Sequence, residues 1–260
     1  MKPVALITGA SSGIGREFAT IHAKRGGNLV IVARSVDKLA AVKADLESTY
    51  SIQVTIIAKD LSLPEAAQEI YDEVKAAGIE VDYLINNAGF GGQGKFHERE
   101  WATDLAMIQL NVVTLTALCR LFLPDFVKRN RGRILNVSST ASLLPGPLQA
   151  VYYATKAYVT SFSNAIAEEL HDTNITVTAL LPGATETEFA RTSGLDKTEL
   201  FKETASARSV AQDGYAGMLA GKLDVISGVS LAQNMTLAMI PFIPKKLLLG
   251  QVREMQSVKP

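Results

Sequence analysis

The chain of 260 residues alternates short apolar segments with segments of helical periodicity, which predicts an α/β fold. Two observations carry this prediction. An apolar run at Val4–Thr8 leads directly into a glycine-rich turn and a helix-like segment, and further apolar runs follow at similar intervals. We found no repeat or linker, so residues 1–260 are expected to form a single domain. We therefore predict a doubly wound, seven-stranded parallel sheet with helices on both faces.

Composition excludes several classes of protein. Lys and Arg number 26, and so do Asp and Glu, so no net field attracts nucleic acid or an acidic membrane. The single cysteine, Cys119, excludes an intramolecular disulfide. The beginning lacks a signal-peptide pattern, and no stretch reads as a membrane span of about 20 apolar residues. We expect a cytoplasmic protein with no transmembrane segment. The histidines have no second ligand at metal spacing, so no metal site is predicted.

The glycine-rich turn G-A-S-S-G-I-G (Gly9–Gly15) joins the first strand to a helix expected from Ile14 to about Lys24. Strand, turn and helix together place a helix N-terminus at the edge of the sheet, where it can bind a pyrophosphate. Glycine permits the close backbone approach that such binding needs. The residues expected to contact a cofactor here are Gly9, Ser11, Ser12, Gly13, Ile14 and Gly15.

The second strand, Asn28–Ala33, is followed by Arg34. An acidic residue near this position would bind the ribose 2′-hydroxyl of NAD, whereas an arginine accommodates the 2′-phosphate of NADP. Arg34 therefore favours NADP(H) over NAD(H). The alternative is that Arg34 is an ordinary surface charge.

The middle of the chain continues the alternation. Helices are expected at Asp37–Tyr50, Pro64–Ala77 and about Glu98–Lys128, and strands at Gln53–Ala58 and Val81–Ile85. The third strand runs into Asp60 and Leu61, and the fourth into N-N-A-G (Asn86–Gly89). Asn111 lies in the middle of the long helix. Because asparagine is a mediocre helix former, its presence there suggests a specific role.

The stretch from Ser138 to Lys156 carries the strongest chemical pattern. Tyr152 and Lys156 are one helical turn apart, and an ammonium beside a phenol lowers the pKa of the phenol. Ser138 and Ser139 follow a strand at Arg133–Val137, at the sheet edge where such folds bind ligands. Together they predict a proton-transfer site for a carbonyl or an alcohol. The alternative is a core tyrosine and a solvated lysine.

The last part of the chain closes the sheet and adds two other segments. A strand is expected at Ile175–Leu181, a helix at about Ser209–Gly221 and a last strand at Asp224–Ser227. Residues 184–210, polar and weakly periodic, suit a substrate lid. Residues 229–260 form an apolar extension broken by Pro241 and Pro244. It is expected to cover the substrate cleft or a partner subunit, with a weak peripheral membrane contact as the alternative.

These motifs, in this order, resemble the short-chain dehydrogenase/reductase family in its single-domain, Rossmann-like form. The resemblance covers about Val4 to Ser227. It rests on T-G-A-S-S-G-I-G (Thr8–Gly15), Asp60, N-N-A-G (Asn86–Gly89), Asn111, Ser139, Tyr152, Lys156 and P-G-A-T-E-T (Pro182–Thr187). The offset between Ser139 and Tyr152 is the family's, which selects Ser139 over Ser138.

The resemblance implies an NADP(H)-dependent oxidoreductase that moves a hydride between nicotinamide and a carbonyl or secondary alcohol. Tyr152 would be the general acid or base, Lys156 would lower its pKa and bind the nicotinamide ribose, and Ser139 would hold the substrate oxygen. Asn111 would hold a water in a relay through Lys156. Further cofactor contacts implied are Asp60, Leu61, Asn87, Ala88, Gly89, Tyr152, Lys156, Pro182, Gly183, Thr185 and Thr187.

Substrate and assembly are less defined by sequence. Leu143–Gln149 and Phe189 indicate an apolar pocket and hence a hydrophobic ketone or aldehyde. The resemblance implies a homodimer or homotetramer built through the long helices around Asn111 and Tyr152. A catalytically silent dinucleotide-sensing regulator is the alternative from another class, and an epimerase or dehydratase on the same fold is a third.

Overall fold

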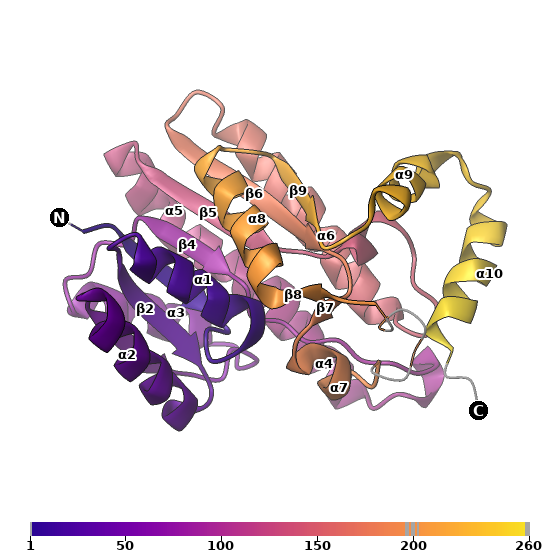
Figure 1. Cartoon of the computed structure of the whole chain (residues 1–260), viewed down its shortest axis with the longest axis horizontal. Coiled ribbons are helices and arrows are strands. Elements are labelled where there is room, and N and C mark those ends of the chain that lie inside the picture. Colours follow the sequence, from indigo (N-terminus) through magenta and orange to yellow (C-terminus); the bar gives the residue numbers. More distant parts are fainter. Residues whose placement is uncertain (1, 196–197, 199–200, 202, 258–260) are drawn as a thin grey trace.

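The computed structural model describes residues 2–195, 198, 201 and 203–257. Its centre is a seven-stranded sheet in the order β3-β2-β1-β4-β5-β6-β9, and every strand pair in it is parallel (Figure 1). The predicted doubly wound parallel sheet is confirmed. The strands are β1 (Val4–Thr8), β2 (Asn28–Ala33), β3 (Val54–Ala58), β4 (Tyr83–Asn86), β5 (Gly132–Val137), β6 (Ile175–Pro182) and β9 (Asp224–Ser227).

Helices cover both faces because successive side chains of a strand point to opposite sides of a sheet. In β1, Ala5 and Ile7 join one buried cluster with Phe18, whereas Leu6 joins another with Phe122. The first face carries α1 (Gly13–Lys24), α2 (Val36–Tyr50) and α8 (Ala207–Leu219); the second carries α3 (Ala66–Ala76), α5 (Leu115–Arg129) and α6 (Ala150–Glu169).

The long helix predicted around Asn111 runs continuously from Trp101 to Arg129, but it is not regular. It consists of α4 (Trp101–Ile108), a π-helical segment η2 (Gln109–Thr114) and α5. By length and composition alone this helix is long and apolar enough to cross a membrane, whereas no stretch of the sequence was expected to be. Here its residues Leu118, Phe122 and Phe126 are buried in the core, as in a core helix of a globular protein.

The expected substrate lid contains short ordered elements. The strands β7 (Thr185–Glu186) and β8 (Ala205–Ser206) pair in parallel, and α7 (Glu188–Thr192) lies between them in the chain. Within the lid, residues 196–197, 199–200 and 202 lie outside the described residues. Two short 3₁₀ helices, η1 (Phe96–Glu98) and η3 (Thr140–Leu143), precede α4 and α6.

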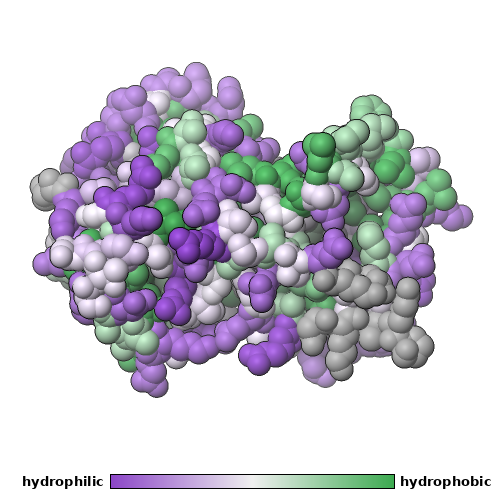
Figure 2. All heavy atoms as spheres, in the orientation of Figure 1, coloured by the Kyte–Doolittle hydropathy of each residue, from purple (hydrophilic) through white to green (hydrophobic). Residues whose placement is uncertain are grey.

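The C-terminal extension is a helical arm that stands at one end of the sheet (Figure 1). It comprises α9 (Leu231–Met239), η5 (Ile240–Phe242) and α10 (Lys245–Gln256). The two prolines separate these helices, as predicted: Pro241 lies in η5 and Pro244 precedes α10. Figure 2 shows hydrophobic side chains gathered over α9. Residues 258–260 of the extension lie outside the described part.

Candidate active site

A cavity of about 680 Å³ opens at the carboxyl ends of the central strands. It gathers nearly all of the site residues predicted from sequence, although they come from six or more separate segments. Those lining it are Gly9, Ser11, Ser12, Gly13, Ile14, Arg34, Asp60, Leu61, Asn87, Ala88, Gly89, Ser139, Tyr152, Lys156, Pro182, Gly183, Thr185 and Thr187. Gly15 and Asn111 do not line it.

The glycine-rich turn has a backbone that requires glycine. Gly9 and Gly13 have φ values of +67° and +53°, in the region that side chains rarely adopt. A Cβ on Gly15 would lie 2.6 Å from Nδ2 of Asn87. Asn87 in turn donates to the carbonyl oxygen of Thr8 at 3.0 Å. Gly15 therefore allows the start of α1 to lie close to the Gly9 backbone and the Asn87 side chain, and the other two glycines shape the turn itself.

The beginning of α1 is suited to an anion. Ser12 precedes the helix without capping it through its side chain, and the first turn contains no acidic residue. The backbone N–H groups of the first turn have no intrahelical partners and carry the positive end of the helix dipole. Because Ser11, Ser12 and Gly13 all line the cavity, these residues fit a pyrophosphate.

Three cationic side chains, Arg34, Lys38 and Lys59, line the same cavity. Lys38 pairs with Glu188 at 3.2 Å, and Lys59 pairs with Glu69 at 2.7 Å. Arg34 is exposed and has no ion-pair partner among residues that the structure describes. A guanidinium that lines a cavity without a protein partner can bind a phosphate there.

Asp60 is held as a carboxylate. It accepts hydrogen bonds from the backbone N–H of Ser62 at 2.9 Å and from its hydroxyl at 2.7 Å. These bonds lower the pKa of the Asp60 carboxyl. A fixed acceptor beside Leu61 suits an N–H donor of the cofactor.

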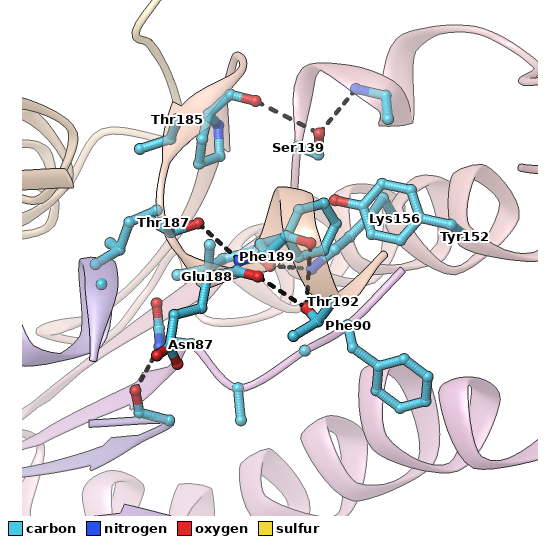
Figure 3. A pocket seen from close by; sticks show the side chains of 18 of the residues that line it. Asn87, Phe90, Ser139, Tyr152, Lys156, Thr185, Thr187, Glu188, Phe189 and Thr192 are labelled. Atoms are coloured by element: carbon cyan, nitrogen blue, oxygen red, sulfur yellow. Dashed lines mark hydrogen bonds between the residues drawn. The ribbon is translucent and has the colours of Figure 1, made fainter. Parts of the chain in front are cut away.

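Tyr152, Ser139 and Lys156 converge on one end of the cavity (Figure 3). The Tyr152 ring is only 8% exposed and packs against Phe189 with a centroid separation of 5.4 Å. Nζ of Lys156 lies 5.8 Å from the centre of the same ring. These three residues therefore line the same end of the cavity.

Burial, more than the lysine charge, decides the protonation of this cluster. It raises the pKa of the Tyr152 phenol well above its ordinary value, and the Ser139 hydroxyl opposes that rise. It also lowers the pKa of Lys156 to about 8. The expected net fall in the pKa of Tyr152 is therefore corrected to a rise. Lys156 donates instead to the carbonyl oxygen of Val137 at 2.8 Å.

The two neighbouring serines have different surroundings. The Ser138 hydroxyl donates to the carbonyl oxygen of Lys156 at 2.9 Å and contacts Oγ1 of Thr160 at 2.7 Å, so it ties β5 to α6. The Ser139 hydroxyl accepts from the N–H of Ala141 at 3.1 Å and makes a long contact of 3.4 Å with the carbonyl oxygen of Pro182. Ser139 is thus the serine available to a substrate, in line with the spacing argument.

Asn111 lies one layer behind the cavity, in the π-helical segment. Its Nδ2 donates to the carbonyl oxygen of Phe90 at 3.0 Å and to Oγ1 of Thr155 at 3.1 Å. Its Oδ1 accepts from the N–H of Phe90 at 3.2 Å. A π-helical turn in a helix often marks a functional position. Asn111 holds the loop at Phe90 against α6 through both of its amide hydrogens and one lone pair of Oδ1.

Tyr153, which follows Tyr152 on α6, also lines the cavity and was not predicted from sequence. Other lining residues lie in segments that were expected near the substrate: Leu143–Gln149, the lid and the C-terminal extension. The remaining residues that enclose the substrate end are Leu144, Leu195, Phe201, Leu237, Val252 and Met255.

The sequence profile of the short chain dehydrogenases matches residues 3–198. The chain belongs to the short-chain dehydrogenase family. The sheet order, the glycine turn and the position of the cavity agree with this membership. Its Rossmann-like single domain is the family's fold.

Individual short-chain dehydrogenases are similar to this chain over different lengths. A very-long-chain 3-oxoacyl-CoA reductase from Rattus norvegicus is 37% identical over 193 residues, covering 72% of this chain and 61% of the relative. The chain thus spans about three fifths of that relative's length. A 7beta-hydroxysteroid dehydrogenase from Mediterraneibacter gnavus is 30% identical over 225 residues, covering 86% of this chain and 85% of the relative.

The fold also matches solved short-chain dehydrogenases. A short-chain dehydrogenase from Sphingobium yanoikuyae in complex with NADPH superimposes with a TM-score of 0.83 at 31% identity, covering 98% of both chains. This likeness includes the C-terminal arm, because so little of either chain is left out. The arm is accordingly part of a fold shared with that structure.

Proposed function

We propose that the protein is an NADP(H)-dependent carbonyl reductase and secondary-alcohol dehydrogenase that acts on hydrophobic ketones. The observation that carries the proposal is the convergence of Ser139, Tyr152 and Lys156 at one end of a cavity whose other end fits a dinucleotide. When bound, the nicotinamide cofactor supplies or accepts the hydride. The protein's residues supply the proton and the alignment.

Tyr152 acts as the general acid in reduction, because burial keeps its phenol protonated at neutral pH. The Ser139 hydroxyl donates to the substrate oxygen, where negative charge develops. The charge of Lys156 stabilises the tyrosinate that remains after proton transfer. Asn111 acts through its neighbours, since its amide holds the Phe90 loop and Thr155 of α6.

The same proposal assigns the cofactor preference to Arg34. The N-terminus of α1 would hold the pyrophosphate, and Arg34 would meet a 2′-phosphate at the end of β2. The NADPH bound to the similar Sphingobium yanoikuyae protein supports this choice. Lys156 would also donate to the nicotinamide ribose.

The substrate class follows from the walls of the cavity's other end. Leu144, Leu195, Phe201, Leu237 and Val252 are apolar. The names of two relatives, a very-long-chain 3-oxoacyl-CoA reductase and a 7beta-hydroxysteroid dehydrogenase, both denote large substrates with an oxidisable or reducible oxygen. A bulky, mostly apolar ketone fits these walls. The described part of the lid contributes Phe189, Leu195 and Phe201, so closure there would exclude water.

Tyr152→Phe tests the proposal. The variant keeps the ring and its packing but lacks the transferable proton, so turnover of a panel of long-chain and steroid ketones should fall at least about 100-fold. NADPH affinity, followed by nucleotide fluorescence, should stay within about threefold. Tyr158→Phe is the matched control, because Tyr158 lies on the same helix and is 40% exposed. Retention of more than about a tenth of the wild-type kcat would contradict the assignment. A wild type that binds NADPH but reduces no carbonyl would instead indicate the dinucleotide-sensing alternative.

A further inference from the structure

The cofactor half of the cavity contains a carboxylate that was not predicted from sequence. It belongs to Glu188, the first residue of α7, whose side chain lines the cavity (Figure 3). Both of its oxygens accept from Nζ of Lys38, at 3.2 and 3.3 Å. Lys38 lies on α2 and lines the same cavity, so this ion pair joins α7 to α2 across the cavity lining.

The same carboxylate lies beside the beginning of α1. Thr187, which precedes Glu188, approaches so closely that a Cβ on Gly13 would lie 3.0 Å from its Cγ2. The hydrogen bond and the charge of Lys38 lower the pKa of the Glu188 carboxyl, and the Ser12 hydroxyl adds to that fall. An acidic side chain from a segment distant in sequence thus reaches the turn that is suited to an anion.

A phosphate of the dinucleotide needs the partners that Glu188 uses. A phosphate and a carboxylate are both anions that accept from an ammonium and from the positive end of a helix. Lys38 directs two of its three N–H donors at the carboxylate. A phosphate at the third donor would bring two anions close together, where they repel each other. The carboxylate and the phosphate are therefore rivals for one ammonium.

The alternative is an ordinary surface ion pair. The Lys38 side chain is 53% exposed and the Glu188 side chain is 49% exposed, and exposed pairs shift an equilibrium by about fivefold or less. The position of the pair distinguishes it. Among the ion pairs in the part of the chain that the structure describes, it alone has both side chains in the lining of the catalytic cavity.

We propose that Glu188 competes with a phosphate of the nicotinamide dinucleotide for Lys38, so that the cofactor binds at the expense of the ion pair between α7 and α2. This inference rests on the cofactor assignment within the proposed function. Glu188 is then a residue that weakens cofactor binding and holds α7 in place. Phe189, the next residue of α7, packs against the Tyr152 ring, so the same helix connects the cofactor half with the catalytic end of the cavity.

NADPH affinity of the full chain, followed by nucleotide fluorescence, tests the proposal. Glu188→Gln keeps the size of the side chain and removes its charge, so NADPH should bind about threefold more tightly. Glu186→Gln is the matched control and should leave the affinity unchanged. It removes the same charge two residues earlier, from an exposed side chain that is not among the described residues lining the cavity.

NADH identifies the phosphate, because it carries the pyrophosphate but no 2′-phosphate. A gain that NADH shares would assign the competition to the pyrophosphate, and a gain confined to NADPH would assign it to the 2′-phosphate. Either result supports the proposal. An unchanged or weaker affinity of Glu188→Gln for both nucleotides would overturn it.

Lys38→Met separates competition from simple repulsion. Without the Lys38 ammonium the carboxylate has nothing to compete for, so adding Glu188→Gln to Lys38→Met should change NADPH affinity by less than about 1.5-fold. The same gain with and without Lys38 would show that Glu188 only repels the cofactor, and it would overturn the proposal.

Hydrogen exchange of the α7 amides, in protein without nucleotide, gives an independent readout. Glu188→Gln and Lys38→Met should both speed exchange in residues 188–192, because each breaks the link to α2, whereas Glu186→Gln should not. Unchanged exchange in both variants would contradict the link between α7 and α2. A wild type that binds NADPH as expected but reduces no carbonyl would contradict the proposed function and leave this inference standing. A wild type that binds neither nucleotide would overturn both.

Discussion

At the scale of single residues, removal from water sets the chemistry of the site. The Tyr152 and Lys156 side chains are both buried at the same end of the cavity, and burial disfavours the charged form of each. The pKa of Tyr152 therefore rises while the pKa of Lys156 falls to about 8. A phenol that stays protonated at neutral pH suits the reduction direction, in which Tyr152 gives up its proton.

This arrangement predicts a pH dependence of stability for the protein without cofactor. The folded pKa of Lys156, about 8, lies below its ordinary value of 10.5, so between these pH values the unfolded chain binds more protons. The contribution of Lys156 to the free energy of unfolding should therefore increase as pH rises from about 8 to 10. The raised pKa of Tyr152 lowers the free energy of unfolding only above pH 10.0, the ordinary pKa of tyrosine. Tyr152 therefore does not affect the trend between pH 8 and 10.

Urea unfolding of the wild type and Lys156→Met at pH 7, 8, 9 and 10 measures the effect. The wild type should gain stability relative to the variant across this series. Lys222→Met, which alters an exposed lysine, should show no such trend. A difference between wild type and Lys156→Met that is the same at all four pH values would contradict the prediction.

Arg34 is predicted to set the cofactor preference. A guanidinium without a described protein partner can form charge-assisted bonds to a 2′-phosphate, worth about 1.5–3 kcal/mol. NADPH should therefore bind at least about tenfold more tightly than NADH, and Arg34→Ala should shrink that difference by weakening NADPH alone. Titration by nucleotide fluorescence measures both. Arg191→Ala, at an exposed position in α7, serves as control, and equal affinities in the wild type would refute the role of Arg34.

At the scale of elements, the C-terminal arm is bound to the substrate end of the cavity. Val252 and Leu248 are buried against Leu143 and Leu144, and Gln256 donates to the Tyr153 hydroxyl. The side chain of Gln93 also donates to the carbonyl oxygen of Gln256. The arm thus forms part of the substrate wall.

Removal of everything after Gly228 is therefore predicted to weaken substrate binding while NADPH affinity stays within a few-fold.

The milder Val252→Ala should raise KM for a hydrophobic ketone, since it deletes apolar surface from the cavity wall. Phe242→Ser is the control, because Phe242 is 77% exposed and does not line the cavity. A soluble truncated protein with unchanged KM would defeat the prediction. Vesicle binding lost on truncation would favour the membrane alternative for the exposed side of the arm.

At the scale of the whole molecule, two sides of the surface are unusually apolar. One is the outer side of the arm. The other lies on the long helix, where Trp101 is 61% exposed and Leu105 is 50% exposed, and on α6, where the 40% exposed Tyr158 stacks on Phe162. Exposed apolar side chains gathered in this way mark an interaction surface.

We predict that this second surface joins copies of the chain into a dimer or tetramer. Sedimentation velocity over a range of concentrations should show a homo-oligomer, and Trp101→Glu combined with Tyr158→Asp should shift it towards the monomer. Leu231→Glu, at a 78% exposed position on the arm, is the control for added surface charge. A wild type that sediments as a monomer at every concentration would count against this assembly.

Much of the fold and of the cofactor half of the site was determined by local sequence. Apolar runs and helical periods fix the positions of β1 and β2, and both ends agree with the structure. Gly9 and Gly13 reflect a backbone conformation that other residues avoid, so they identify the turn by themselves. The one-turn spacing of Tyr152 and Lys156 needed only a helix to bring them together.

Tertiary structure alone decided the substrate half and the protonation of the site. Val252 reaches the cavity from about a hundred residues beyond Tyr152. The apolar pattern of residues 229–260 indicated a covering segment, but not which of its side chains line the cavity. Burial likewise depends on the whole surrounding shell, so it reversed the pKa shift expected for Tyr152. The hydrogen bonds of the Asn111 amide also depend on neighbours distant in sequence. A sequence specifies which groups are present, but solvent exclusion and hydrogen-bond partners exist only once the chain has folded.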